Sequence, residues 1–243
     1  MAASISDVVE LPVENSRVVL KGCTGSGKTS LLIKRYEYMV KHLGIAGDRI
    51  LVLLMNKDRC IDWERKISTV CAGFVSNTTF KEFVQEEINT YYPIILKNNP
   101  DIKCKRLKPL FLSQQISQFL LNKAVEARRK KRGVFASVAA DTPSIVSCLS
   151  NNLLKAAASG IPYKEIGNRL YSSLAQKDET KKQIFADADE VIDAYRKKCL
   201  EFGMFDFAMC LELYVGCLLI DGQYVRRLHE RIEHLIVDDL EES

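Results

Sequence analysis

The segment 22–29, with the sequence Gly-Cys-Thr-Gly-Ser-Gly-Lys-Thr, constrains this chain more than any other. It matches the pattern GxxxxGK[ST] at every fixed position. In this pattern the glycines let the backbone turn tightly and direct successive N–H groups at phosphate oxygens. A helix that begins at the lysine adds the positive end of its dipole. We therefore predict a nucleotide-phosphate site lined by Gly22, Cys23, Thr24, Gly25, Ser26, Gly27, Lys28, Thr29 and Ser30.

The segments on either side of this loop predict a strand–helix–strand unit. Residues 17–21 form a short β-branched run, which predicts a buried strand. A helical stripe follows the loop, and a continuous apolar run at 50–55 predicts a strand buried on both faces. The stripe comprises Leu32, Tyr36, Met39, Val40 and Leu43. The chain therefore begins as an α/β fold with a parallel sheet.

The middle of the chain has a different periodicity. From 101 to 204 helical stripes dominate, and prolines and glycines punctuate them. One stripe consists of Leu112, Ile116, Phe119 and Leu120, and a longer one runs from Ile184 to Cys199. Residues 232–239 return to a strand. We predict an α/β core at 1–100 and 205–243, interrupted by an all-helical insert at 101–204.

Composition excludes several classes of protein. A hydrophobic fraction of 47% with 27% charged residues is ordinary for a globular chain, and the net charge of +4 is only mildly basic. None of the eight cysteines forms a CxxC pair, so neither a disulfide framework nor a zinc site is predicted. No apolar stretch reaches the length of a membrane helix, and no secretory signal is visible. We expect a cytoplasmic protein that does not contact a membrane.

An apolar strand that ends in two acids supplies the second part of a phosphoryl-transfer site. The sequence Leu-Ile-Val-Asp-Asp occupies 235–239. Such a strand has the Walker B form, in which the first acid holds Mg²⁺ and the second orients or deprotonates the attacking water. We assign Asp238 and the hydroxyl of Thr29 to the metal. Lys28 would contact the β- and γ-phosphates, and Asp239 would act on the nucleophile.

These segments together resemble the first RecA-like domain of UvrD/Rep-type superfamily 1 DNA helicases. The loop at 22–29 resembles motif I, residues 50–58 resemble motif Ia, and Thr-Phe-Lys-Glu-Phe at 79–83 resembles motif Ib. Residues 205–207, with Leu211 and Leu213, are similar to the helix before motif II, and residues 237–242 resemble motif II. The helical stretch also lies where such helicases carry an accessory subdomain.

The resemblance implies a P-loop NTPase, RecA-like core that binds Mg·ATP and single-stranded or partly duplex DNA. The positions that match the family's DNA contacts are Asn56, Lys57, Thr79 and Lys81. Asp239 stands where the family has its catalytic glutamate, and Glu241 stands where it has a glutamine that senses the γ-phosphate. The sequence ends at Ser243, directly after motif II. Unwinding therefore implies a second RecA-like lobe or a partner subunit.

Two other interpretations stay open at this stage. The first is an ATP-dependent switch or regulatory module without helicase activity, which Asp239 and Glu241 favour. The second is a small-molecule or nucleotide kinase, whose arginine-rich lid the cluster Arg-Arg-Lys-Lys-Arg at 128–132 imitates. That cluster could equally line a nucleic-acid path or form a solvated helix end.

Overall fold

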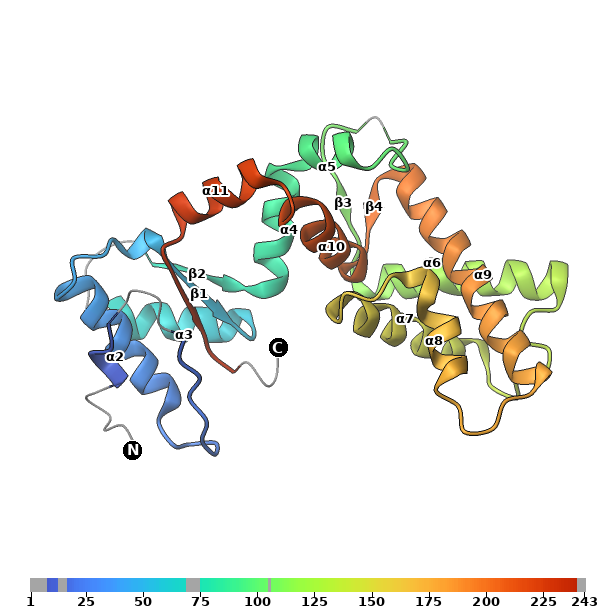
Figure 1. Cartoon of the computed structure of the whole chain (residues 1–243), viewed down its shortest axis with the longest axis horizontal. Coiled ribbons are helices and arrows are strands. Elements are labelled where there is room, and N and C mark those ends of the chain that lie inside the picture. Colours follow the sequence, from blue (N-terminus) through green and yellow to red (C-terminus); the bar gives the residue numbers. More distant parts are fainter. Residues whose placement is uncertain (1–7, 13–16, 69–74, 105, 240–243) are drawn as a thin grey trace. The chain divides into compact units, whose positions relative to one another are not determined.

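The computed structural model describes residues 8–12, 17–68, 75–104 and 106–239, and the chain divides into two compact units (Figure 1). We call Met1–Phe83 with Gln223–Ser243 the sheet unit and Val84–Gly222 the helical unit. The elements of the sheet unit are α2 (Lys28–Lys41), η1 (Gly47–Arg49), β1 (Ile50–Leu54), α3 (Lys57–Ser68), β2 (Ser76–Thr79), α11 (Gly222–Arg231) and β5 (His234–Val237). Helix α4 (Phe80–Thr90) crosses the boundary between the units.

The sheet unit contains a parallel sheet of three strands in the order β2-β1-β5. Leu54 pairs with Thr79 on one side of β1, and Leu53 pairs with Val237 on the other. Every residue of β1 is buried, as a central strand with both faces covered requires. The predicted strand at 50–55 is therefore confirmed, except that Met55 lies beyond it and is exposed. The carboxyl ends of all three strands meet at one edge of the sheet.

Helices α2 and α3 pack on this sheet, and α2 does so with the apolar face that the spacing predicts. Tyr36 and Met39 of α2 pack with Trp63 and Ile67 of α3, and the Tyr36 and Trp63 rings meet edge to face at 6.5 Å. Burying such side chains contributes about 1.5–3 kcal/mol each. Leu43 belongs to the predicted stripe but follows the end of α2 and is exposed.

The strand predicted at 17–21 does not form. These residues have no regular secondary structure, and the Val18 and Val19 side chains are 51% and 70% exposed. An extended segment is stable as a strand only when it pairs with a neighbour and buries a face. The three strands of the described sheet pair with one another and not with this run. Its β-branched residues have a high strand propensity, but the segment does not become a strand because it does not pair with the described sheet.

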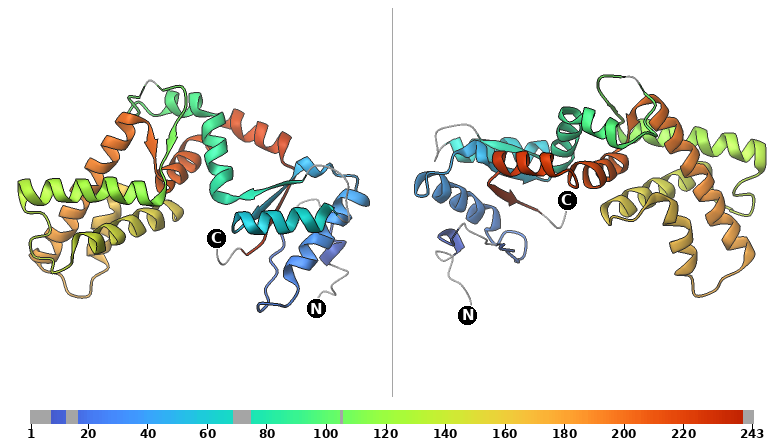
Figure 2. Two further views of the ribbon diagram at one scale, coloured as in Figure 1. Left: turned by 180° about the vertical axis from the view of Figure 1, so that it is seen from behind. Right: turned by 45° about the horizontal axis from the view of Figure 1, so that its top comes forward.

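The helical unit is a bundle built around α6, α7 and α9. Helix α6 packs against both α7 and α9, and Figure 2 shows the three from two further directions. Its elements are α5 (Tyr92–Asn98), β3 (Leu110–Phe111), α6 (Gln114–Arg132), α7 (Thr142–Ala158), η2 (Tyr163–Glu165), α8 (Ile166–Ser172), α9 (Glu179–Phe202), β4 (Met204–Phe205), α10 (Phe207–Leu213) and η3 (Tyr214–Leu218). The long stripe predicted from Ile184 to Cys199 lies on α9, which ends at Gly203 in the left-handed conformation.

The stripe predicted for α6 is partly on the wrong face of the helix, although Leu112, which precedes α6, is buried and Leu120 is half-buried. Ser117, Leu121 and Val125 are the buried residues of α6, whereas Ile116 and Phe119 are 51% and 59% exposed. Both sets have helical spacing, so periodicity alone could not decide between them. The face that meets α7 and α9 is the one that includes the small Ser117.

The region 101–204 is not entirely helical. Strands β3 and β4 form a two-residue parallel pair, with Leu110 opposite Met204 and Phe111 opposite Phe205. Two residues are too few to produce an alternating pattern, so the sequence does not predict these two strands. The compact units divide the chain after 83 and 222, whereas the predicted boundaries lie at 100 and 204. The structure thus groups α5 and α10 with the helical unit.

Within the described residues, no single helix is both long and apolar enough to cross a membrane. One bent pair, Phe207–Leu218 with Gly222–Arg231, meets the length and composition requirements only when its two helices are taken together.

Candidate functional site

The glycine-rich loop has a backbone that its glycines alone permit without strain. Gly25 and Gly27 have φ angles of 81° and 86°, in the left-handed region. A Cβ atom on Gly22 would come within 2.6 Å of the Ser26 hydroxyl oxygen. The Ser26 amide closes the turn by donating to the Cys23 carbonyl at 3.2 Å. The loop is thus a tight, glycine-dependent turn that leads directly into α2.

Gly27 is the N-cap of α2, and no side chain caps the helix there within the described chain. The first amides of a helix have no partner inside it. They carry the positive end of the helix dipole, which is not offset by any acidic residue in the first turn of α2. This end of α2 therefore presents amides suited to phosphate oxygens, including those of Thr29 and Ser30.

The Lys28 ammonium lies back over its own loop. Its Nζ donates to the carbonyl oxygens of Gly22 at 2.9 Å and Cys23 at 3.3 Å. The positive charge is therefore held at the loop. A cation in this position complements an anionic group bound by the loop amides.

The two acids of the predicted Walker B strand follow β5 at the carboxyl edge of the sheet. Asp238 is only 5% exposed, and its amide continues the sheet by donating to the Leu53 carbonyl at 3.1 Å. Its Oδ1 accepts the Asp239 amide at 3.1 Å, and Asp239 has a left-handed φ of 53°. The Asp238 carboxylate is thus fixed by the strand, while the chain turns sharply at Asp239. Glu241 lies outside the described residues.

Arg59 on α3 is a member of this site that the sequence did not single out. Its Nε lies 3.8 Å from the Asp239 Oδ2. Arg59 occupies the first turn of α3, directly after β1, so the parallel register brings it beside the end of β5. The signal available in the sequence is its position three residues after Asn56, the residue that caps α3.

The four predicted DNA-contact residues gather where β1 and β2 end. Asn56 follows β1, and its side-chain oxygen accepts the Arg59 amide at 3.0 Å, which caps α3. Thr79 ends β2 and caps α4, because its hydroxyl oxygen accepts the Glu82 amide at 3.2 Å. Lys57 and Lys81 occupy the first turns of α3 and α4. The parallel pairing of β1 with β2 places the two helix N-termini side by side.

Glu82 ties this cluster together. Its carboxylate receives the Lys57 ammonium at 2.8 Å and the Thr79 hydroxyl at 3.1 Å. Thr79 and Glu82 thus form a capping box at the start of α4. The Lys57 ammonium holds the pKa of the Glu82 carboxyl below its usual value, against the opposing effect of burial. The same pair raises the pKa of Lys57, so both groups are charged at neutral pH.

The arginines of the basic cluster mostly join helices within the helical unit. Arg128 and Arg132 both approach the Glu190 carboxylate of α9, at 3.3 and 3.2 Å. Arg129 donates to the Thr142 hydroxyl at 2.9 Å and to the Ala140 carbonyl at 3.4 Å. These contacts attach the end of α6 to α9 and to the start of α7, so the cluster is not simply a solvated helix end.

The comparison with known families agrees with this arrangement of loop, strands and acids. The sequence model of the UvrD/REP helicase N-terminal domain matches residues 2–241, which is nearly the whole chain. The chain therefore belongs to the UvrD/REP helicase N-terminal domain family, as the motifs predicted. Proteins of this family are ATP-dependent DNA helicases with a P-loop NTPase fold. A search of curated proteins finds no match.

Proposed function

We propose that the sheet unit binds Mg·ATP as the nucleotide-binding lobe of a DNA helicase. The observation that carries this proposal is the loop itself, in which left-handed glycines precede a helix without a side-chain cap. The amides from 22 to 30 would receive the phosphates, and the Lys28 ammonium would turn from its own carbonyls to the β- and γ-phosphates. Two of its present contacts are with loop carbonyls, which a change of side-chain conformation would release.

The donors for the metal are a hydroxyl and a carboxylate. Mg²⁺ prefers such hard oxygen ligands and usually retains several waters. Thr29 in the first turn of α2 and the buried Asp238 supply them in our proposal. When bound, the ion would neutralise charge on the phosphate oxygens. Asp239 would accept a proton from the attacking water, and Glu241 would take the role of the family's γ-phosphate-sensing glutamine.

The test of the nucleotide site is a titration with a fluorescent ATP analogue. Lys28→Ala should weaken binding at least about tenfold, which is the loss expected for a hydrogen bond to a charged group. Lys34→Ala is the matched control because Lys34 is an exposed lysine on the same helix. Equal affinities of the Lys28→Ala and Lys34→Ala proteins would refute the site.

For DNA, we propose that the N-termini of α3 and α4 bind the backbone of a single strand. Two adjacent helix starts offer amides to phosphates, and Lys81 adds charge. Asp58 and Glu82 in these first turns offset part of the helix dipoles, and Lys57 would have to leave Glu82 to reach a phosphate. Asn56 and Thr79 would position these helix ends, because each side chain already caps one of them. Lys81→Gln should weaken oligonucleotide binding and lower its salt dependence. Lys66→Gln, on the far end of α3, should change neither.

Hydrolysis coupled to unwinding would require a second RecA-like lobe or a partner subunit. In that assembly the 101–204 region would serve as an insert of the P-loop core, which we place at 1–100 and 205–243. The substrate would be single-stranded or partly duplex DNA. Measuring unwinding by this chain with and without added second-lobe protein tests the dependence. Unwinding by the 243-residue chain alone would contradict it.

One observation favours a nucleotide-dependent switch without helicase activity. The Asp239 Oδ2 lies 3.8 Å from the Arg59 Nε, and an ion pair that engages this oxygen competes with its contact to an attacking water. A switch would bind ATP with normal affinity and show no DNA-stimulated hydrolysis. If Arg59→Gln raised the rate of ATP hydrolysis, the ion pair between Arg59 and Asp239 would be what limits hydrolysis. If the wild-type protein hydrolysed ATP faster with DNA, the switch interpretation would fail.

A further inference from the structure

We propose that the helical unit binds a small, neutral and largely apolar molecule in a cavity between α7, α8 and α9. The cavity has a volume of about 230 Å³. Its ligand would be the size of a bicyclic aromatic molecule and would carry one hydrogen-bond donor. The residues that line the cavity include none of those assigned above to nucleotide or DNA. The proposal therefore does not depend on the function proposed above.

The size of the cavity is the first observation. Side chains of α7, α8 and α9 and of the loop between α6 and α7 line it, and its walls include the buried side chains of Phe135, Ile166 and Ile192. Close-packed protein interiors contain few voids larger than a water molecule. An apolar cavity of about 150 Å³ stays free of water and binds benzene. A cavity of about 230 Å³ therefore suits a molecule about half as large again as benzene.

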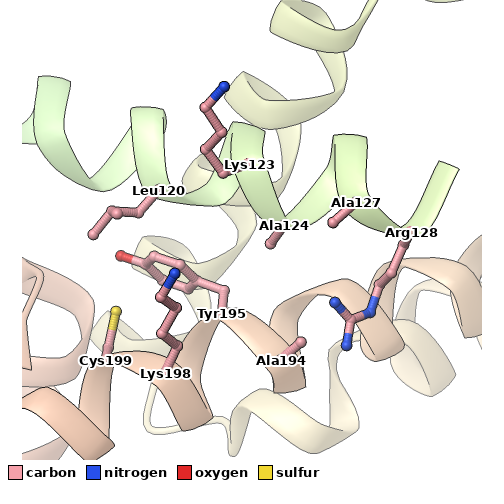
Figure 3. A pocket seen from close by; sticks show the side chains of 9 residues that line it. All are labelled: Leu120, Lys123, Ala124, Ala127, Arg128, Ala194, Tyr195, Lys198 and Cys199. Atoms are coloured by element: carbon pink, nitrogen blue, oxygen red, sulfur yellow. The ribbon is translucent and has the colours of Figure 1, made fainter. Parts of the chain in front are cut away.

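The lining of the cavity selects a neutral ligand. Every described residue that lines it is uncharged. A different cavity of the same unit, of about 170 Å³ between α6 and α9, has the opposite character. Figure 3 shows the side chains of Lys123, Arg128 and Lys198 around that second cavity. A charged ligand would lose its hydration in the apolar cavity without gaining a counter-ion, which costs free energy that a neutral ligand does not lose.

Polar side chains of α7 lie where the apolar cavity opens to solvent. Ser144, Cys148 and Asn152 follow one another at intervals of four residues, so they lie along one face of the helix. Ser144 and Cys148 are exposed, whereas Ile145 and Leu149 beside them are buried. The Asn152 amide group donates to the Cys148 sulfur at 3.6 Å. We assign the carbonyl oxygen of the same Asn152 side chain as the acceptor for the ligand's donor.

Two carboxylates of α9 hold the walls of the cavity in place. Phe135 has a left-handed φ of 58°, and its amide donates to the buried Asp187 carboxylate at 2.7 Å. The Gly167 amide of α8 donates to the Asp189 carboxylate at 3.0 Å, and a Cβ on Gly167 would lie only 2.3 Å from that carboxylate. A backbone such as that of Phe135 persists only where the surroundings enforce it, and such residues cluster at ligand sites. The cavity is therefore already formed before a ligand enters.

The test is isothermal titration calorimetry of the full chain with indole, a neutral bicyclic molecule with one N–H donor. We expect saturable binding at one site. Ala188→Leu places a larger side chain in the cavity from α9, so it should weaken indole binding at least about tenfold. Asn152→Ala removes the acceptor and should weaken binding about two- to tenfold. Circular dichroism of each variant excludes unfolding as the cause.

Two variants serve as matched controls. Ala127→Leu enlarges a side chain that lines the cavity between α6 and α9 instead. Ala186→Leu adds the same side chain at an exposed position of α9 that does not line the apolar cavity. Both should bind indole as the wild-type protein does. Indole-3-acetate, which carries a carboxylate, should bind the wild-type protein at least about tenfold more weakly than indole.

The exposed thiol of Cys148 reports occupancy of the cavity independently. Indole at ten times its Kd should slow the alkylation of Cys148 by N-ethylmaleimide about tenfold, measured on peptides by mass spectrometry. Cys23 is the internal control, because it is an exposed thiol in the glycine-rich loop of the sheet unit. Its rate of alkylation should not change.

Three results would overturn the proposal. The first is the absence of saturable indole binding, and the second is binding that Ala188→Leu leaves unchanged. The third is self-association of the chain in sedimentation velocity that Ala188→Leu abolishes, because it would assign the cavity to a side chain of a second copy. Loss of indole binding in Ala127→Leu but not in Ala188→Leu would place the ligand between α6 and α9 and would equally refute the site.

Discussion

The left-handed backbone conformation of a single residue, Gly27, determines whether the loop keeps its shape. Its φ of 86° is strained for any side chain, although a Cβ there would meet nothing within 4 Å. Gly27→Ala should therefore lower the free energy of unfolding by about 1 kcal/mol through backbone strain alone. It should also weaken nucleotide binding, because relief of the strain moves the amides. Denaturant titration and the ATP-analogue titration measure the two effects.

Gly216→Ala should change the free energy of unfolding in the opposite direction from Gly27→Ala. Gly216 has no positive φ, lies in η3 and has open space around its Cβ position. Alanine should therefore stabilise this helical segment by about 0.5–1 kcal/mol. Equal effects of the two substitutions would contradict the strain argument.

His234 on β5 makes the stability of the protein depend on pH. Burial lowers the pKa of its imidazole below 6.5, and the nearby Arg35 charge acts in the same direction against Glu233. The unfolded chain therefore binds the proton more readily than the folded one. Stability should be constant above about pH 6.5 and should fall as the pH drops from there toward the lower, folded-state pKa.

His234→Gln should flatten this fall, as measured by urea midpoints from pH 5 to 8. His229→Gln, on α11, removes an imidazole elsewhere and serves as the control. If His229→Gln reduced the dependence of the urea midpoint on pH as much as His234→Gln did, the effect would not be specific to His234.

Helix α10 depends on Asp206 for more than its cap. One carboxylate oxygen accepts the Met209 amide at 2.8 Å, and the other accepts the Tyr195 hydroxyl of α9 at 2.7 Å. Asp206→Ala removes the cap and leaves a buried hydroxyl without its acceptor. The expected loss is about 2–4 kcal/mol, the sum of both effects. Asp141→Ala, which removes the exposed cap of α7, should cost about 1 kcal/mol in the same denaturation experiment.

The elements predicted correctly are those whose signal is local and strong. Helices α2 and α9 and strand β1 follow from apolar spacing, and the site loop follows from its glycines. Strand β2 has the polar sequence Ser-Asn-Thr-Thr, so only its pairing with β1 makes it a strand. Residues 17–21 have a sequence that favours a strand but do not pair with the described sheet. The exposed position of Phe119 depends on which face of α6 meets its neighbours, and no local pattern contains that information.

The candidate site shows the same limit. The glycines of the loop and the acids after β5 have a recognisable type and spacing. The residues of the loop and Asp238 could therefore be predicted from the sequence as candidate site residues. The roles of Glu82 and Arg59 could not be predicted, because those roles come from partners on other elements. Glu82 acts through Lys57, and Arg59 acts through Asp239. Ion pairs across strand ends arise from the parallel register, which is a property of the folded sheet.

At the scale of the whole molecule, the division into two units predicts how bound nucleotide stabilises the chain. Every residue that we assign to ATP lies in the sheet unit, which has its own core around Tyr36, Val52 and Trp63. A ligand at 100 times its Kd stabilises the unit that binds it by about 2.7 kcal/mol. If the units unfold separately, hydrogen exchange with saturating Mg·ATP should slow about 100-fold in β1 and β5. Exchange in α7 and α9 should not change. At the same nucleotide concentration Lys28→Ala should reduce the slowing to about tenfold or less. Equal slowing in both units would show that the chain unfolds as one cooperative body.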